Sequence, residues 1–149
     1  MKENSSILFS QNTVETICAV VLLNSVGDAL LQLRDEKPDL SASGLWVFPG
    51  GHKEPEEDIQ TCAEREFFEE TNYHCGNLRW LMQIVDSFLC QNQMILHIFW
   101  DHYDGQSAII CQEGQALEFI SRERALDIAM PAYLVAIWDL VRLTSKNSK

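Results

Sequence analysis

The segment Ile59–Thr71 most constrains the fold of this chain, because it runs for thirteen residues without glycine or proline. Asp58 directly precedes it and is a suitable N-cap for a helix. Asn72 follows its last turn, where a left-handed residue is favoured and asparagine is the usual choice after glycine. The apolar residues fall on one stripe that should face a core: Ile59, Cys62, Ala63 and Phe67. The sequence therefore predicts an amphipathic helix over 59–71.

Segments rich in β-branched and apolar residues lie on both sides of this helix. Before the helix, a hairpin is predicted from the strands Val14–Leu23 and Ala29–Leu33, which are joined by a turn at Gly27-Asp28. After the helix, three further strands are predicted: Leu78–Phe88, Met94–Trp100 and Ala116–Ile120. A short helix is expected at Ser121–Ile128 and a longer one at Tyr133–Leu143. The longer helix carries a predicted apolar stripe of Leu134, Ile137, Leu140 and Val141. This alternation of strands and helices favours an α/β fold, a mixed sheet with helices packed on its faces.

The length and composition fit one domain. The chain has 149 residues, of which 46% are hydrophobic and 22% charged, and domains commonly run to roughly 100–200 residues. We expect a single domain over 1–149, with loose polar ends at 1–12 and 144–149. No apolar run approaches the ~20 residues of a membrane-spanning helix, and the sequence contains no Cys-x-x-Cys pair. We expect no export signal. The expected location is the cytoplasm, without a membrane partner.

The chain is strongly acidic, with a formal net charge of −11. Nucleic-acid backbones require a basic surface, so we expect no nucleic-acid partner. More than half of the excess charge lies within residues 51–70, which hold eight acidic and two basic residues. An anionic ligand must therefore be held by something other than net charge.

Three glutamates share one face of the predicted helix, since Glu66, Glu69 and Glu70 lie at positions i, i+3 and i+4. Like charges at this spacing weaken an isolated helix by roughly a few tenths of a kcal/mol per pair. They also lie near its C-terminus, where the helix dipole disfavours anions. Helix stability does not explain this placement. A cluster of carboxylates suits a hard divalent cation such as Mg²⁺ or Mn²⁺, whereas the alternative is a solvated acidic face.

The residues around this cluster complete a longer pattern. Gly51 is followed after five residues by Glu57, and after seven more by the run Arg65–Tyr73. This spacing resembles the signature of the Nudix hydrolases, Gly-x5-Glu-x7-Arg-Glu-U-x-Glu-Glu-x-Gly-U, where U is a bulky apolar residue. Every fixed position matches except Asn72, where the family has glycine. The resemblance covers nearly the whole chain and implies a Nudix-type α/β/α sandwich with a central mixed β-sheet.

The resemblance also implies ligands for a divalent metal, Mg²⁺ or Mn²⁺. Glu66, Glu69 and Glu70 would bind it together with the carbonyl of Gly50, and Glu57 would reach it directly or through water. Arg65 would orient carboxylates by charge-assisted hydrogen bonds. Because Arg65 is adjacent to Glu66 along the helix, we expect it not to share that residue's face and to pair with Glu57 or a loop group.

A second stretch, Gln112–Phe119, is similar to a Glu-Gly-Gln-x-x-Glu-aromatic stretch of the MutT-type pyrophosphohydrolases. On that match Glu113 would be a metal ligand or the general base, and Glu118 would have a structural role. In the wider family the base can instead be a glutamate of the signature helix. The catalytic candidates are therefore Arg65 and either Glu66 or Glu113.

Three residues are candidates for substrate binding. Arg34, at the end of the second strand, could contact a phosphate, whereas Trp46 and Phe48 could stack on a base or simply pack in the core. The implied reaction is metal-dependent hydrolysis of a pyrophosphate bond in a nucleoside di- or triphosphate, which releases a nucleoside monophosphate and pyrophosphate or phosphate. Nucleotide sugars or dinucleoside polyphosphates are alternative substrates. An inactive Nudix-fold ligand-sensing module is the alternative of another class. We expect a small-molecule nucleotide partner and a monomer or homodimer.

Overall fold

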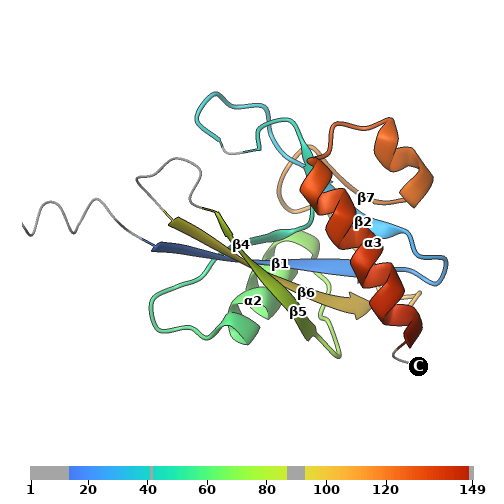
Figure 1. Cartoon of the computed structure of the whole chain (residues 1–149), viewed down its shortest axis with the longest axis horizontal. Helices are drawn as coiled ribbons and strands as arrows, with labels where there is room; N and C mark the ends of the chain where they lie inside the picture. Colours follow the sequence, from blue (N-terminus) through green and yellow to red (C-terminus); the bar gives the residue numbers. More distant parts are fainter. Residues whose placement is uncertain (1–13, 41, 87–92, 148–149) are drawn as a thin grey trace, which may run out of the picture.

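The computed structural model describes residues 14–40, 42–86 and 93–147. A mixed sheet carries the helices on its faces (Figure 1). The strands are β1 Val14–Leu23, β2 Ala29–Leu33, β3 Trp46–Val47, β4 Gly50–His52, β5 Arg79–Asp86, β6 Gln93–His102 and β7 Ala116–Ile120. The helices are α2 Ile59–Thr71, the 3₁₀ helix η1 Arg122–Leu126 and α3 Ala132–Asn147. The predicted α/β class and mixed sheet are confirmed.

Strand β1 organises the sheet. The strand order is β3-β2-β1-β6-β5, with β4 also paired to β1 and β7 to β2. Strand β1 runs parallel to β6, from Val14 opposite Gln93 to Leu23 opposite His102, and the other pairings are antiparallel. The single parallel pairing among the described strands therefore makes the sheet mixed. Within the described ranges, no helix has the length and apolar content needed to cross a membrane.

Alternate residues of β1 face two separate hydrophobic clusters, as expected for the two-residue period of a strand. One cluster joins β1 to α3 through Ala19, Val21, Leu23, Leu134, Ile137, Trp138 and Val141. The other joins β1 to α2 through Cys18, Val20, Leu22, Cys62, Ala63 and Phe67. The two helices therefore cover opposite faces of the sheet.

Helix α2 has the bounds that the sequence predicts. Asp58 is its N-cap, and the Asp58 side chain accepts a hydrogen bond from the Thr61 N–H at 2.7 Å. Asn72 is its C-cap in the left-handed conformation, with φ 60° and ψ 20°. Asparagine thus accommodates the backbone geometry for which glycine is favoured.

We predict that the departure at Asn72 has little effect on the fold. Asn72→Ala should lower the free energy of unfolding by about 1 kcal/mol, because a Cβ without a polar side chain disfavours this conformation. Asn72→Gly should change it by less than about 1 kcal/mol. Denaturant unfolding of both variants measures the difference. A larger loss for glycine than for alanine would contradict this account of the helix end.

Two expectations for the C-terminal part are wrong. Helix α3 continues to Asn147, so residues 144–147 are not a loose tail; each further helical residue adds a backbone hydrogen bond, and Lys146 complements the dipole at this end. The second wrong expectation is the place of Leu140 in the apolar stripe of this helix, because Leu140 is 41% exposed. The buried stripe instead includes Trp138, whose Nε1 donates to the Gly27 carbonyl at 3.1 Å.

Smaller differences concern the ends of elements. The short helix expected at 121–128 is the 3₁₀ helix η1, which spans Arg122–Leu126, and the strand expected to begin at Leu78 is β5, which begins at Arg79. Strand β4 was not expected, because consecutive glycines are poor strand formers. The predictions for residues 1–12, 87–88 and 148–149 lie outside the described residues.

Candidate functional site

Strand β4 and helix α2 approach each other closely at the site. Gly50 lies opposite Ala19 of β1, and Gly51 lies opposite Cys18. A Cβ on Gly50 would lie 2.1 Å from the Cys18 carbonyl oxygen, and a Cβ on Gly51 would lie 2.2 Å from Oε2 of Glu66. The two glycines therefore allow the backbone of β4 to contact β1 on one side and a carboxylate of α2 on the other.

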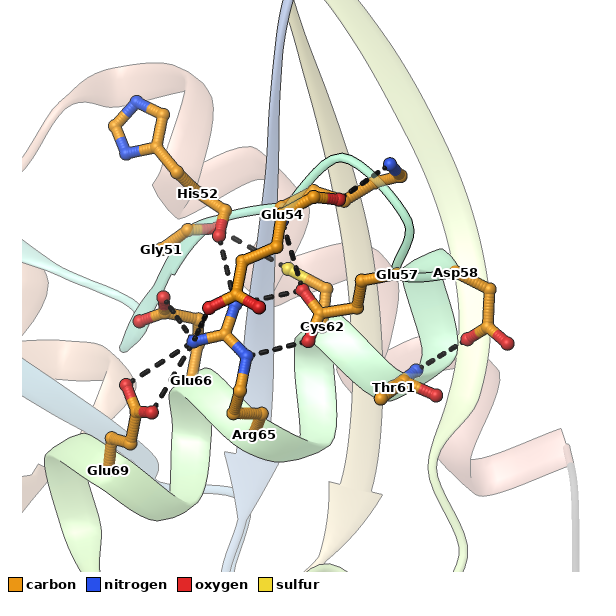
Figure 2. A network of polar contacts seen from close by, with 11 residues as sticks. Gly51, His52, Glu54, Glu57, Asp58, Thr61, Cys62, Arg65, Glu66 and Glu69 are labelled. Carbon is orange, nitrogen blue, oxygen red and sulfur yellow. Dashed lines mark hydrogen bonds and ion pairs between the residues drawn. The ribbon is translucent and has the colours of Figure 1, made fainter.

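Arg65 is the centre of a network of ion pairs (Figure 2). Its Nε and Nη2 donate to the two carboxylate oxygens of Glu57 at 2.6 and 2.8 Å. Its Nη1 donates to Oε1 of Glu66 at 2.9 Å and to both oxygens of Glu69 at 3.4 Å. Its Nη2 also donates to the carbonyl of His52 at 3.1 Å. One guanidinium thus links β4, the loop before α2 and two glutamates of the helix.

The pairing of Arg65 with Glu57 is confirmed, but the expectation that Arg65 would not reach the side of Glu66 is wrong. The guanidinium presents donors in several directions at the end of a long stem, so it binds a neighbouring residue despite the helical offset. The hydrogen bonds from Arg65 lower the pKa of Glu57 to about 2. Glu57 is therefore an ionised carboxylate held in a fixed orientation.

Glu70 is 2% exposed, and two groups hold its carboxylate. Oε1 accepts from Nε2 of Gln32 at 3.0 Å, and Oε2 accepts from the Gly50 N–H at 3.2 Å. Burial, together with the carboxylates of Glu113 and Glu66, raises the pKa of Glu70 to about 8 despite these hydrogen bonds. Burial also raises the pKa of Glu66, and the charge of Glu113 adds to this effect. Three mutually repelling carboxylates therefore lie close together.

A cavity of about 560 Å³ adjoins these carboxylates. It is lined by the acidic residues Glu66, Glu70 and Glu113 and by both glycines of β4. Arg34, His52 and Tyr133 add polar groups to its lining. The other lining residues are apolar: Ile17, Ala19, Leu40, Ala42, Val47, Phe48, Met94, Leu96 and Leu134. The cavity thus combines an acidic region with a largely apolar one.

The structure brings most of the predicted site residues to this cavity. Its lining includes six of them: Arg34, Phe48, Gly50, Glu66, Glu70 and Glu113. Arg65, Glu57 and Glu69 do not line the cavity but connect to it through the bond from Arg65 to Glu66. Trp46 does not line it either; this side chain is half-buried and packs against the hydrophobic cluster that joins β1 to α3.

Sequence reasoning missed several residues of the site. Gln32 carried a usable signal, because it is a polar residue within the apolar strand Ala29–Leu33. Met94 and Leu96 carried none, since apolar strand residues line a core as readily as a cavity.

The carboxylates do not form a ready-made coordination shell. Among the residues that the structure describes, no group of three or more His, Cys, Asp and Glu side chains is arranged to hold a metal ion. The chemistry of the donors nevertheless fits a hard divalent cation, which prefers oxygen ligands. The carboxylates of Glu66, Glu70 and Glu113 share one cavity, and their mutual repulsion would be relieved by a cation.

Comparison with known proteins identifies the architecture. The family model for the NUDIX domain matches residues 13–136. A MutT protein from Methanosarcina mazei Go1 is similar with a TM-score of 0.74 and 22% identity, over 93% of this chain and 99% of that chain. The NUDIX domain of Shewanella oneidensis NrtR, in complex with ADP ribose, is similar with a TM-score of 0.76 and 15% identity, over 97% of this chain and 99% of that chain. A C. elegans Ap4A hydrolase, solved as a binary complex, is similar with a TM-score of 0.65 and 18% identity, over 88% of this chain and 98% of that chain. These similarities confirm the α/β/α sandwich with a central mixed sheet.

Proposed function

The chain belongs to the NUDIX domain family, and from that premise we propose that it is a divalent-metal-dependent pyrophosphohydrolase acting on nucleoside di- or triphosphates. The supporting observation is that Glu66, Glu70 and Glu113 line one cavity together with Gly50 and an apolar surface. The carboxylates suit a metal and its phosphate ligand, and the apolar surface suits a base or another attached group. The products would be a nucleoside monophosphate and pyrophosphate or phosphate.

In this proposal Mg²⁺ or Mn²⁺ would be held by oxygen donors of β4, α2 and the loop between them. The ligands would be the Gly50 carbonyl and the carboxylates of Glu66, Glu69 and Glu70, with Glu57 reaching the metal directly or through water. When bound, the metal supplies positive charge to phosphate oxygens and lowers the pKa of a water molecule. Glu113, in the loop that precedes β7, would be a further ligand or the general base.

The protein's own groups have distinct roles. Arg65 holds Glu57, Glu66 and Glu69 in their relative positions, because its guanidinium donates to all three carboxylates and to the His52 carbonyl. Glu66 or Glu113 accepts the proton of the attacking water. Arg34 lines the same cavity as these acids and would bind a substrate phosphate. Phe48 also lines it and would pack beside the nucleobase of the substrate. Trp46 is left out of this site because it does not line the cavity.

The test is release of phosphate and pyrophosphate from a panel of nucleotides, with Mg²⁺ and with a chelator. The panel contains nucleoside triphosphates, nucleoside diphosphates, nucleotide sugars and dinucleoside polyphosphates. We expect turnover of one class that stops on chelation and returns with added Mg²⁺. Mg²⁺ binding without turnover of any compound would contradict the enzymatic proposal and favour the ligand-sensing module, which nucleotide-induced thermal shifts would then examine.

Nucleotide sugars and dinucleoside polyphosphates are the second substrate candidate. One structural relative binds ADP ribose, and another is an Ap4A hydrolase. The same acidic and apolar lining would accept either type of compound. The panel separates them from simple nucleotides directly.

We also propose the setting in which this activity operates. A single domain spanning the chain would act in the cytoplasm as a monomer or homodimer. A formal net charge of −11 supports a small-molecule nucleotide partner over a nucleic acid. No membrane partner is included in the proposal.

Glu113→Gln tests the choice of general base. If Glu113 is the base, kcat should fall more than about 10-fold, since such groups typically contribute ~10²–10⁴. Glu118→Gln is the matched control, because Glu118 lies in the following strand, where it pairs with Arg124 at 3.9 Å, and should leave kcat unchanged. An unchanged kcat in Glu113→Gln would assign the base to Glu66.

A further inference from the structure

Gln32 is a buried polar side chain in an otherwise apolar strand. It lies in β2 and is 2% exposed. Its Nε2 donates to Oε1 of Glu70 at 3.0 Å and to the main-chain carbonyl of Glu113 at 3.3 Å. A single amide group therefore contacts both the last turn of α2 and the loop that precedes β7.

This loop packs tightly against the end of β2 and the end of α2. Gly114 has a φ of +84°, and a Cβ there would lie 2.6 Å from the Leu33 carbonyl oxygen and 3.0 Å from Cγ of Gln32. The Gln112 N–H donates to the main-chain carbonyl of Glu70 at 3.1 Å. The backbone of the loop is thus anchored at both elements, whereas Gln32 adds a side-chain bond to the carboxylate itself.

We propose that Gln32 is a positioning residue that fixes the Glu70 carboxylate relative to the Glu113 loop, so that both acids face the same cavity. This inference rests on the proposed function, because it concerns the metal site proposed there. The Gln32 amide does not line the cavity and so acts through Glu70 and Glu113 rather than on a ligand. Without this donor, the Glu70 carboxylate would be held on one side only, by the Gly50 N–H at Oε2, and Oε1 would lose its tie to the Glu113 loop.

The size of the effect follows from the chemistry of such partners. Groups that orient metal ligands typically change metal affinity or activity by roughly 10–100-fold when removed. A merely structural glutamine would instead lower stability and leave metal affinity unchanged. Metal affinity measured without substrate therefore separates the two roles.

The experiment compares Gln32→Met with Gln115→Met. Gln115 also ties the loop to β2, since its Nε2 donates to the Arg34 carbonyl at 2.8 Å, but its acceptor is a main-chain oxygen rather than a carboxylate. The Kd for Mn²⁺ is measured by electron paramagnetic resonance on the metal-free proteins, followed by kcat, KM and Tm. Gln32→Met should weaken Mn²⁺ binding about 10–100-fold and lower kcat similarly, with KM changed less than about 3-fold. Gln115→Met should stay within about 3-fold of wild type for each quantity.

Gln32→Asn guards against a folding defect in the methionine variant. It keeps an amide but shortens the side chain by one methylene, so it should also weaken Mn²⁺ binding by at least about 10-fold. A lower Tm with unchanged Mn²⁺ affinity in both Gln32 variants would overturn the positioning role. A loss in Gln115→Met as large as that in Gln32→Met would overturn it as well.

The same measurements distinguish failure of this inference from failure of the proposed function. Wild-type protein that binds Mn²⁺ but hydrolyses nothing in the panel overturns the proposed function, and the Mn²⁺ affinities still decide the role of Gln32. Wild-type protein that does not bind Mn²⁺ overturns both. Metal-dependent turnover with equal Mn²⁺ affinity in wild type and Gln32→Met overturns the positioning role alone.

Discussion

Replacing Glu70 with glutamine is expected to lower kcat by roughly 100-fold or more and to weaken Mg²⁺ binding, because loss of a ligand should exceed the 10–100-fold cost of losing an orienting partner. Glutamine has the shape of glutamate but no charge to offer a cation. Glu70 is also the most constrained acid of the cavity, held by Gln32 and by the Gly50 N–H. Steady-state kinetics and Mg²⁺ titration measure both effects.

The Glu70→Gln variant should remain folded. Replacing an acid whose charged form burial disfavours should raise the free energy of unfolding by about 1–3 kcal/mol. The glutamine amide has one oxygen and cannot accept from both Gln32 and the Gly50 N–H, which should lower it by about 1–3 kcal/mol. These contributions oppose each other, so the cooperative unfolding transition should persist. Glu64→Gln, at an exposed position of the same helix, is the control and should keep full activity. Full activity in Glu70→Gln would overturn the assignment of Glu70 as a metal ligand.

The adjacent glycines of β4 should respond to alanine in different ways. At Gly50 the added Cβ would meet backbone atoms of β1, 2.1 Å from the Cys18 carbonyl oxygen and 2.6 Å from Cα of Ala19. Backbone cannot move aside without breaking the β1–β4 pairing, so Gly50→Ala should lower the free energy of unfolding by on the order of 3 kcal/mol. Calorimetry or denaturant unfolding would detect such a loss.

At Gly51 the added Cβ would meet the end of the Glu66 side chain, 2.2 Å from Oε2. A carboxylate can rotate away, so Gly51→Ala should fold but lose at least about 10-fold in kcat, as expected for a displaced ligand. Gly76→Ala is the control, because no atom lies within 4 Å of its added Cβ. Equal destabilisation by alanine at positions 50 and 51 would show that the two contacts do not differ as described.

The sequence was most informative where one physical rule decided the outcome. Helix α2 was predicted with its observed ends, because a cap, an uninterrupted run and a left-handed residue mark them locally. Strands β1, β2 and β7 also have the predicted bounds. Strand β4 depends on pairing with β1 across the chain, and no local propensity reveals that contact.

The site could be predicted in part for the same reason. Fixed spacing pointed to Glu66 and Glu70, and a second short pattern pointed to Glu113; these three acids line one cavity, whereas Glu69 does not. The reach of Arg65 to Glu66 depends on the conformation of its side chain, which spacing alone does not determine. The packing of Trp46 against the core and the position of Gln32 beside Glu70 depend on how distant strands pack.

The parallel pairing of β1 with β6 has a consequence for the order in which this protein folds during synthesis. Residues 14 and 93, which pair in this ladder, are 79 positions apart. At roughly 5–20 residues per second, a ribosome needs about 4–16 seconds to make the intervening chain. One edge of the apolar strand β1 therefore stays unpaired throughout that interval. A nascent chain of this protein would present that edge to chaperones, or to other nascent chains, before its acidic cavity exists.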